Sequence, residues 1–450
     1  MSLYRFLLSV ACIAAPIAQS NFAQEIDPDA PLPVNPAIRI GTLENGMKYY
    51  VRENRKPEGR AIVRLVVNVG SIQETEEQRG LAHFVEHMAF NGSENFNKSE
   101  VVDFMEEIGM SFGTHLNAST SFNETIYKLE FPMDDPEVVN KAFLILDDWA
   151  SGIEFSQEEI DAERGVVIEE WRARKSAASR IREKQYPLTY YKSLYKDRLP
   201  IGLIPILETA NRDEFLKFYN DWYRPDLMAV IAVGDFDGEE IERKIIEQFA
   251  DIENSGGPER TDTPIPDHQD TLVSIEVDPE LTNSSLSIML KKPLHRDRTA
   301  RDFMDGMVES MYYDMLNSRI GEKTRRENPP FQGAAVGRGR LGREKDSVRI
   351  IVGFLGDAYE KGINGVLDEI DRVNRDGFTQ SEFERRKVNM LRGIERALAE
   401  KDKRMSSSLV GELIRNFTVE EPIPGIDLEM AILKKAVEVA TLEKVNAVGK

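Results

Sequence analysis

The chain has 450 residues, which exceeds the roughly 250–300 residues at which single hydrophobic cores stop growing, so its length predicts two or more domains. With 41% hydrophobic and 30% charged residues, the composition is that of a folded globular protein and excludes a disordered or collagen-like chain. The formal net charge of −20 argues against a nucleic-acid partner, because phosphates bind an excess of Lys and Arg that this chain lacks. An anionic membrane surface is disfavoured by the same sign.

The first residues predict a signal for export. Arg5 precedes an apolar run from Phe6 to Ala18, and small residues suited to cleavage end this segment. Because the run is shorter than the roughly 20 residues that a membrane-spanning helix needs, we expect a signal peptide at residues 1–23 and no membrane anchor after its cleavage. The single cysteine, Cys12, lies in this segment, and a mature chain without cysteine fits an oxidising compartment, which we expect to be the periplasm.

Strand and helix signals alternate after this segment, in the manner of a mixed α+β domain. Asn45-Gly46 separates two strand-like runs within residues 40–52 and predicts a hairpin with a two-residue turn. The apolar run at 61–70 predicts a buried strand, and helical spacing begins at Gly80. Further patterns predict a strand at 127–131, a helix at 136–149 with proline in its first turn, a helix at 212–222 and a strand at 227–233.

Two copies of one domain, separated by a linker, account for the length of the chain. The linker is predicted at residues 254–270, a polar stretch rich in Gly, Pro, Asp and Thr. We expect the first domain at residues 24–253 and a homologous second domain at residues 271–450. No strand pattern follows Thr441, so we expect the second domain to be truncated at its C-terminus, as in a fragment of a longer protein.

The evidence for duplication is a short motif that occurs on both sides of the linker. The sequences Phe-Ser-Gln-Glu-Glu-Ile at 155–160 and Phe-Thr-Gln-Ser-Glu-Phe at 378–383 carry the same helix-start signal. Ser156 or Thr379 is placed to cap a helix, and a glutamate three residues later completes a capping box. In both copies apolar residues flank the cap as a hydrophobic staple, which makes coincidence a poor explanation.

Most of the chemistry in the sequence is concentrated in the run from Gly80 to Phe90. His83 and His87 are four residues apart on the predicted helix, so both imidazoles lie on one face about one turn apart, as a shared metal ion requires. Glu86 lies on the same side, where a carboxylate could take a proton from water held by the metal. The order His-x-x-Glu-His inverts the zinc-peptidase motif His-Glu-x-x-His and predicts one zinc ion.

A third protein ligand must come from elsewhere, because a catalytic zinc usually has three and keeps its fourth position for water. The helix capped by Ser156 carries Glu163 and Glu170 two turns apart, and therefore on one face. These two are the candidates, with Glu169 as the competitor for Glu170. His115 is expected to be a surface or subsite residue rather than a ligand.

Several stretches are specific enough to indicate a family. They are His83-x-x-Glu86-His87-Met88-Ala89-Phe90-Asn91-Gly92, Asn117 to Thr120 with Glu124 to Tyr127, Glu163-Arg164-x-Val166-Val167-x-x-Glu170, and Tyr223-Arg224-Pro225 before Val233-Gly234-Asp235. The chain resembles the pitrilysin/insulinase family of inverted-zincin metallopeptidases, and most closely its periplasmic bacterial members. The resemblance covers nearly all of residues 38–450.

The resemblance implies an α+β fold of duplicated domains, each a mostly antiparallel sheet packed with helices as in processing peptidases, that forms one half of a clamshell. It implies that His83, His87 and Glu170 bind one Zn²⁺ and that Glu86 is the general base. Glu163 would then orient the site from behind the ligands.

The strand with Asn117 and Ala118 would, by the same resemblance, pair with the peptide substrate; an ordinary edge strand is the alternative. At the repeat spacing, Glu163 and Glu170 correspond to Arg386 and Gly393, so the second domain is expected to be non-catalytic.

We therefore expect a zinc endopeptidase acting on peptides or unfolded polypeptides. The alternative is a non-catalytic subunit that binds or scaffolds peptides. The second half of the clamshell would be either a missing C-terminal portion or a partner subunit.

Overall fold

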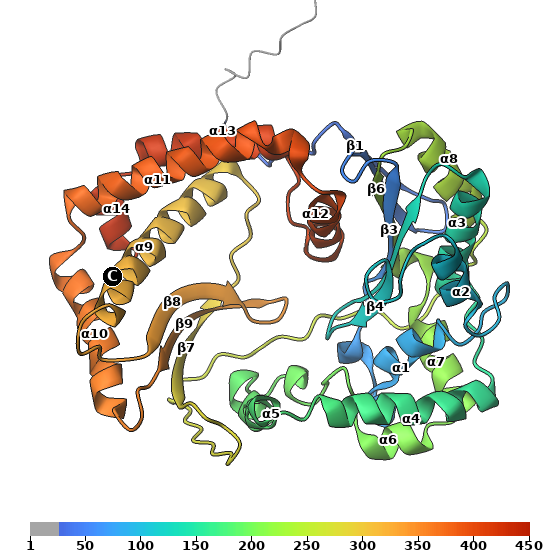
Figure 1. Ribbon diagram of the computed structural model, residues 1–450, viewed down its shortest axis with the longest axis horizontal. Coiled ribbons are helices and arrows are strands. Elements are labelled where there is room, and N and C mark those ends of the chain that lie inside the picture. Colours follow the sequence, from blue (N-terminus) through green and yellow to red (C-terminus); the bar gives the residue numbers. More distant parts are fainter. Residues whose placement is uncertain (1–26) are drawn as a thin grey trace, which may run out of the picture.

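The computed structural model describes residues 27–450, so the predicted signal peptide at 1–23 lies outside the described residues. Two sheets, one of six strands and one of three, lie side by side along the longest axis, each packed with helices (Figure 1). This arrangement confirms the predicted α+β class with two mostly antiparallel sheets. None of the described helices is both long and apolar enough to cross a membrane.

The first sheet holds the buried strands that the apolar runs predict. Its strands are β1 (Ile38–Thr42), β2 (Lys48–Glu53), β3 (Arg60–Val67), β4 (Leu116–Thr120), β5 (Thr125–Pro132) and β6 (Met228–Gly234). They lie in the order β1-β2-β6-β3-β5-β4, and every neighbouring pair is antiparallel except β2 and β6. Strand β6 is buried along its whole length, as expected for a central strand covered on both faces. Strand β4 is last in the order, so one of its edges is unpaired among the described strands.

Helices cover the first sheet and form the larger hydrophobic core with it. They are α1 (Leu81–Met88), α2 (Glu100–Glu107), α3 (Pro136–Ser151), α4 (Gln157–Ala173), α6 (Ile204–Thr209), α7 (Arg212–Trp222) and α8 (Gly238–Phe249). Helix α5 (Ala177–Thr189) follows α4 and lies outside this core. Short 3₁₀ turns are η1 (Ser71–Gln73), η2 (Glu76–Gln78), η3 (Leu194–Lys196) and η4 (Pro225–Leu227). Phe84 on α1, Phe143 and Trp149 on α3 and Phe131 on β5 are fully buried in this core. The predicted helices at 136–149 and 212–222 are confirmed.

The hairpin between β1 and β2 is confirmed, but its turn is longer than the two residues predicted. The connecting loop extends from Leu43 to Met47, and Gly46 adopts a positive φ of 98°. The side chain of Asn45 explains the longer loop, because it accepts from the Met47 backbone (3.1 Å) and donates to the carbonyl of Phe249 at the end of α8 (2.8 Å). Asn45 therefore ties the loop to a distant helix, which the local pattern does not encode.

The two predicted helix caps are present, but only one is a complete capping box. Ser156 accepts from the backbone of Glu159 (3.2 Å) at the start of α4, whereas the Glu159 side chain pairs with Lys98. Thr379 and Glu382 form the full reciprocal box at the start of the corresponding helix in the second part. An ion pair to another element has replaced half of the box in the first copy.

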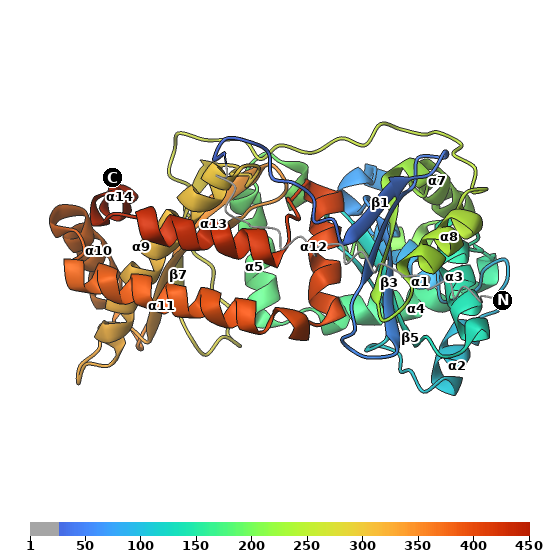
Figure 2. The same cartoon turned by 90° about the horizontal axis from the view of Figure 1, so that it is seen from above.

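The second part of the molecule also consists of a mostly antiparallel sheet packed with helices, but its sheet is smaller. Its antiparallel strands are β7 (Ser285–Pro293), β8 (Gly333–Arg340) and β9 (Lys345–Gly353), in the order β7-β9-β8. Its helices are α9 (Ala300–Thr324), α10 (Tyr359–Asp376), α11 (Gln380–Ala399), α12 (Ser406–Val419), α13 (Ile426–Val439) and α14 (Leu442–Ala447), with the 3₁₀ turn η5 (Lys401–Lys403). Figure 2 shows α9, α11 and α13 packed side by side.

One helix of each part packs against or extends toward the other part. Helix α12 lies against the first sheet (Figure 1), where Leu409 and Leu413 are buried with Tyr50 of β2. Helix α5 extends toward the second sheet, and its Arg180 forms a two-pronged ion pair with Asp278 (both contacts 2.8 Å). The two parts are therefore held together by packing and ion pairs as well as by the irregular chain between α8 and β7.

Candidate metal centre

The helix that carries the two histidines is fixed at its start by a buried carboxylate. The Glu74 side chain accepts from the backbone N–H groups of Gly80 (3.0 Å) and Ala82 (2.9 Å), which satisfies donors that the first helical turn leaves free. Gly80 has a φ of 109°, and a Cβ there would meet the backbone of Gly202 at 2.8 Å. Burial raises the pKa of Glu74 to about 8, against the opposing effect of the two N–H donors. The position of α1 is therefore set by buried polar contacts.

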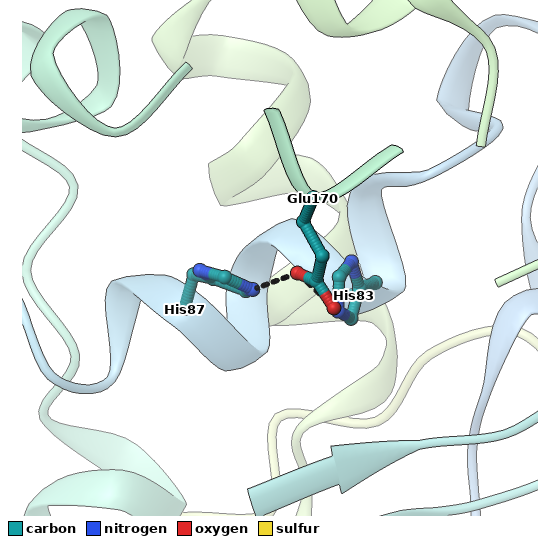
Figure 3. Close-up of side chains that lie close together, drawn as sticks. All are labelled: His83, His87 and Glu170. Carbon is teal, nitrogen blue, oxygen red and sulfur yellow. Dashed lines mark ion pairs between the residues drawn. The ribbon is translucent and has the colours of Figure 1, made fainter. Parts of the chain in front are cut away.

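Two imidazoles from α1 and one carboxylate from α4 converge at the centre of the site (Figure 3). The Nε2 atoms of His83 and His87 lie 3.6 Å and 3.2 Å from Oε2 of Glu170. One ligand atom from each residue lies within 4.8 Å of the others, so the three could hold a metal ion. Two histidine nitrogens and one carboxylate oxygen are a donor set that zinc prefers.

The neighbours of these residues determine which atoms face the centre. Oε1 of Glu163 lies 2.8 Å from Nδ1 of His87, which leaves Nε2 of that ring directed at Glu170. Arg174 pairs with the other oxygen of Glu170. Glu169, the competitor of Glu170 in the sequence, pairs with Arg172 and is 69% exposed, so it is not part of the converging group.

The ionisable side chains at the centre of the site shift one another's pKa. Burial lowers the pKa of His87, but its contacts with Glu163 and Glu170 outweigh burial and raise this pKa to about 9. Burial lowers the pKa of His83, and the nearby His87 lowers it further. The contact with His87 holds the pKa of Glu170 below its usual range. The site therefore combines one cationic ring with carboxylates, and a metal cation would take the place of the proton on His87.

Glu86 lies beside this group and has a partner of its own. Its side chain is buried, and its Oε2 accepts a hydrogen bond from the hydroxyl of Thr120 at 2.6 Å. Burial raises the pKa of Glu86, and the Thr120 hydrogen bond opposes that shift. The sequence motif did not identify Thr120, although the alternation along β4 puts it on the same face as the buried Leu116 and Ala118.

A cavity of about 380 Å³ opens over the converging side chains. It is lined by His83, Glu86, His87, Phe90, Phe112, Asn117, Ala118, Ser119, Thr120, Glu170 and Arg174. Asn117 and Ala118 thus lie at the cavity on edge strand β4, where the Asn117 amide donates to the carbonyl of Gly113 (3.2 Å). His115 is not among the residues that line the cavity, and its Nδ1 accepts from the backbone of Ser111 (3.1 Å).

The corresponding positions in the second part carry different chemistry. Arg386 on α11, which corresponds to Glu163, pairs with Asp314 on α9. Gly393, which corresponds to Glu170, offers no side chain. Within residues 27–450, no other group of three potential metal-binding side chains converges.

Two family models match successive stretches of the chain, and the second stretch begins within the first part of the molecule. The model described as Insulinase (Peptidase family M16) matches residues 49–198, which include all of the converging side chains. The model described as Peptidase M16 inactive domain matches residues 209–390.

Curated relatives extend well beyond the matched region. A protein described as "Zinc protease PQQL-like" from Arabidopsis thaliana is 36% identical over 88% of this chain and 38% of its own length. A "Probable zinc protease PqqL" from Haemophilus influenzae is 32% identical over 80% of this chain and 39% of its own length. The chain therefore spans about two fifths of the length of these relatives.

Solved structures identify the fold as one half of such a molecule. The first half of the periplasmic protease PqqL from Escherichia coli matches with a TM-score of 0.87 and 26% identity, over 93% of this chain and 90% of that chain. The complete PqqL structure matches with a TM-score of 0.86 over 93% of this chain but only 46% of that chain. The fold described above is therefore that of one clamshell half.

Proposed function

Because the chain belongs to the insulinase family of peptidases (M16), we propose that it carries the zinc centre of an endopeptidase that cleaves peptides or unfolded polypeptides. The observation that supports this function most is the convergence of His83, His87 and Glu170 beside the buried Glu86 in one open cavity. A binding site without catalysis would not need a buried carboxylate next to a metal-binding group.

The roles of the residues follow from their positions. His83, His87 and Glu170 would hold one zinc ion, and Glu163 would keep the His87 ring oriented through Nδ1. Zinc held there supplies a Lewis acid for the peptide carbonyl and lowers the pKa of a water molecule. Glu86 accepts the proton of the attacking water and passes it to the leaving amine nitrogen. The hydroxyl of Thr120 fixes one oxygen of Glu86, which leaves the other to exchange the proton.

Strand β4 offers the means to align a peptide with these groups. It is an edge strand among the described strands, and Asn117 and Ala118 on it line the cavity. A substrate that adds to this edge by main-chain hydrogen bonds would be extended, and recognition would depend little on its side chains. An unfolded polypeptide meets both conditions.

The remaining wall of the active site is proposed to come from another half. The chain spans about two fifths of its curated relatives, and the complete PqqL structure extends well beyond the matched half. A further segment of the same protein or a partner subunit would enclose the peptide over the cavity. Because the structural relative is described as periplasmic, we also propose export to the periplasm.

The proposed base is tested by replacing Glu86 with glutamine. We expect the Glu86→Gln variant to keep wild-type zinc content, measured by metal analysis of the purified protein. Hydrolysis of an unstructured fluorogenic peptide should fall about 10²-fold or more, because proton transfer by a positioned side chain contributes that much. Glu169→Gln is the matched control, because this neighbouring carboxylate is 69% exposed and should leave both readouts unchanged.

Two outcomes would contradict the assignment. Full hydrolysis by Glu86→Gln would show that another group is the base. A wild-type chain that binds zinc and peptide but cleaves no bond, alone or with its other half, would favour the non-catalytic peptide-binding subunit.

A further inference from the structure

The turn between β4 and β5 lies directly behind the proposed base. Thr120, which donates to Glu86, is the last residue of β4, and the turn continues through residues 121–124. The turn is closed by a hydrogen bond from Ser121 N to Glu124 O (2.8 Å). The Ser121 hydroxyl donates to Oε1 of Glu124 (2.7 Å) and accepts from the Asn123 and Glu124 backbones (both 3.1 Å). The position of Thr120 therefore depends on how firmly this turn is held.

A side chain from the second part of the molecule holds this turn. Arg343 lies in the loop between β8 and β9, and its Nη2 donates to Oε2 of Glu124 (2.9 Å) and to the carbonyl of Asn123 (3.1 Å). The Arg343 side chain is only 7% exposed. A charge-assisted hydrogen bond that is shielded from water is worth more than a pair on the surface. This contact therefore ties the second part to the turn behind the cavity.

The loop that presents Arg343 is shaped for this contact. Gly342 has a φ of 68°, and a Cβ there would lie 3.0 Å from Ile265 and 3.1 Å from the ring of Tyr195. The hydroxyl of Tyr195 accepts from the Arg343 backbone (3.3 Å) and donates to the Asn123 side chain (2.9 Å). The apolar cluster of Ile72, Tyr195, Ile265 and Leu341 packs around this contact. Residues from four separate segments of the chain thus surround this contact.

We propose that Arg343 is a positioning residue for the metal centre: by holding the β4–β5 turn, it fixes Thr120 and through it the carboxylate of Glu86. The predicted effect of Arg343 on hydrolysis depends on the proposed function. Its predicted effect on the stability of the turn is independent of that function. The second part of the molecule, which has no metal-binding group among its described residues, would thereby contribute to the geometry of the active site.

Arg343→Met tests this inference, because methionine keeps an unbranched apolar stem and removes the guanidinium. We expect amide hydrogen exchange in residues 120–125 to become about tenfold faster, the size expected from losing a hydrogen bond to a charged group. The kcat for peptide hydrolysis should fall about tenfold as well, while zinc content stays at the wild-type value because no ligand lies on the turn. Arg343→Lys, which keeps the charge but not the fork, should recover part of both effects.

The matched control is Arg340→Met on the same hairpin. Arg340 pairs with Asp346 (3.5 Å) and is 44% exposed, so its removal should leave exchange in residues 120–125 unchanged. Glu124→Ala removes the other partner of the ion pair together with the Ser121 hydrogen bond, so Arg343→Met should speed exchange less in the Glu124→Ala background than in the wild type. If Arg343→Met does not fold, Arg343→Lys is compared with the Arg340→Met control in its place, because it changes no contact within the turn itself.

Exchange in residues 120–125 that stays within twofold of the Arg340→Met control would overturn the inference. Faster exchange of the turn with unchanged kcat in an active enzyme would also overturn it, because the turn would then not position Glu86. If the wild type hydrolyses nothing even with its other half, the proposed function fails, and the exchange comparison still decides whether Arg343 holds the turn.

Discussion

At the residue scale, several side chains of the candidate metal centre are held in place by a second contact. His87 is oriented by Glu163, Glu86 by Thr120, and the start of α1 by Glu74. The histidines and Glu86 could be predicted from sequence because they lie on one helical turn, where spacing determines their relative position. The roles of Thr120 and Glu74 could not be predicted. Both residues contact α1 only in the folded chain, and such contacts leave no periodic signal in the sequence.

Glu74 gives a prediction about pH and stability. Its pKa rises from 4.5 to about 8 on folding, so between these values the folded protein keeps a proton that the unfolded chain has lost. The free energy of unfolding should therefore fall as pH rises through this window. Between pH 5 and pH 8, the free energy of unfolding of Glu74→Gln should fall by about 1–3 kcal/mol less than that of the wild type. Urea unfolding at several pH values measures this difference. Identical pH slopes for both proteins would show that Glu74 is not responsible.

At the scale of elements, apolar patterning predicted individual strands and helices but not which elements meet. The strands at 61–70 and 227–233 are present because each is an apolar run buried in the sheet, whereas the strand at 127–131 alternates buried apolar residues with partly exposed charged ones. No local pattern indicates that α12, in the second part, covers the first sheet. The turn between β1 and β2 and the capping box of α4 differ from their predictions because Asn45 and Glu159 bind partners far away in the sequence.

The packing of α12 on the first sheet gives a prediction about stability. Leu413 is 1% exposed and lies with Tyr50 in the cluster between α12 and the sheet. Leu413→Ala should lower the free energy of unfolding by about 2–5 kcal/mol, because it removes buried methyl groups and leaves a cavity. Val388→Ala on α11 is the control, because Val388 is 45% exposed and should change stability by less than about 0.5 kcal/mol. Similar losses in chemical denaturation of both variants would contradict this role of α12.

At the scale of the whole molecule, the two parts carry different side-chain chemistry, and each packs elements against the other. The first part supplies the converging side chains, and the second supplies α12 and Arg343. Helix α5 of the first part contacts the segment before β7 of the second. Duplication could be predicted from the repeated helix start at Ser156 and Thr379. The exchange of helices could not, because it depends on the shape of both folded parts.

The proposed function requires above all one zinc ion held by His83, His87 and Glu170. Crystals of the protein grown with zinc can be measured on both sides of the zinc absorption edge, so that an anomalous difference map locates the metal. We expect one strong peak at about 2.0–2.2 Å from the Nε2 atoms of both histidines and from an oxygen of Glu170. No peak at this position, or a peak bound by other residues instead, would contradict the central claim.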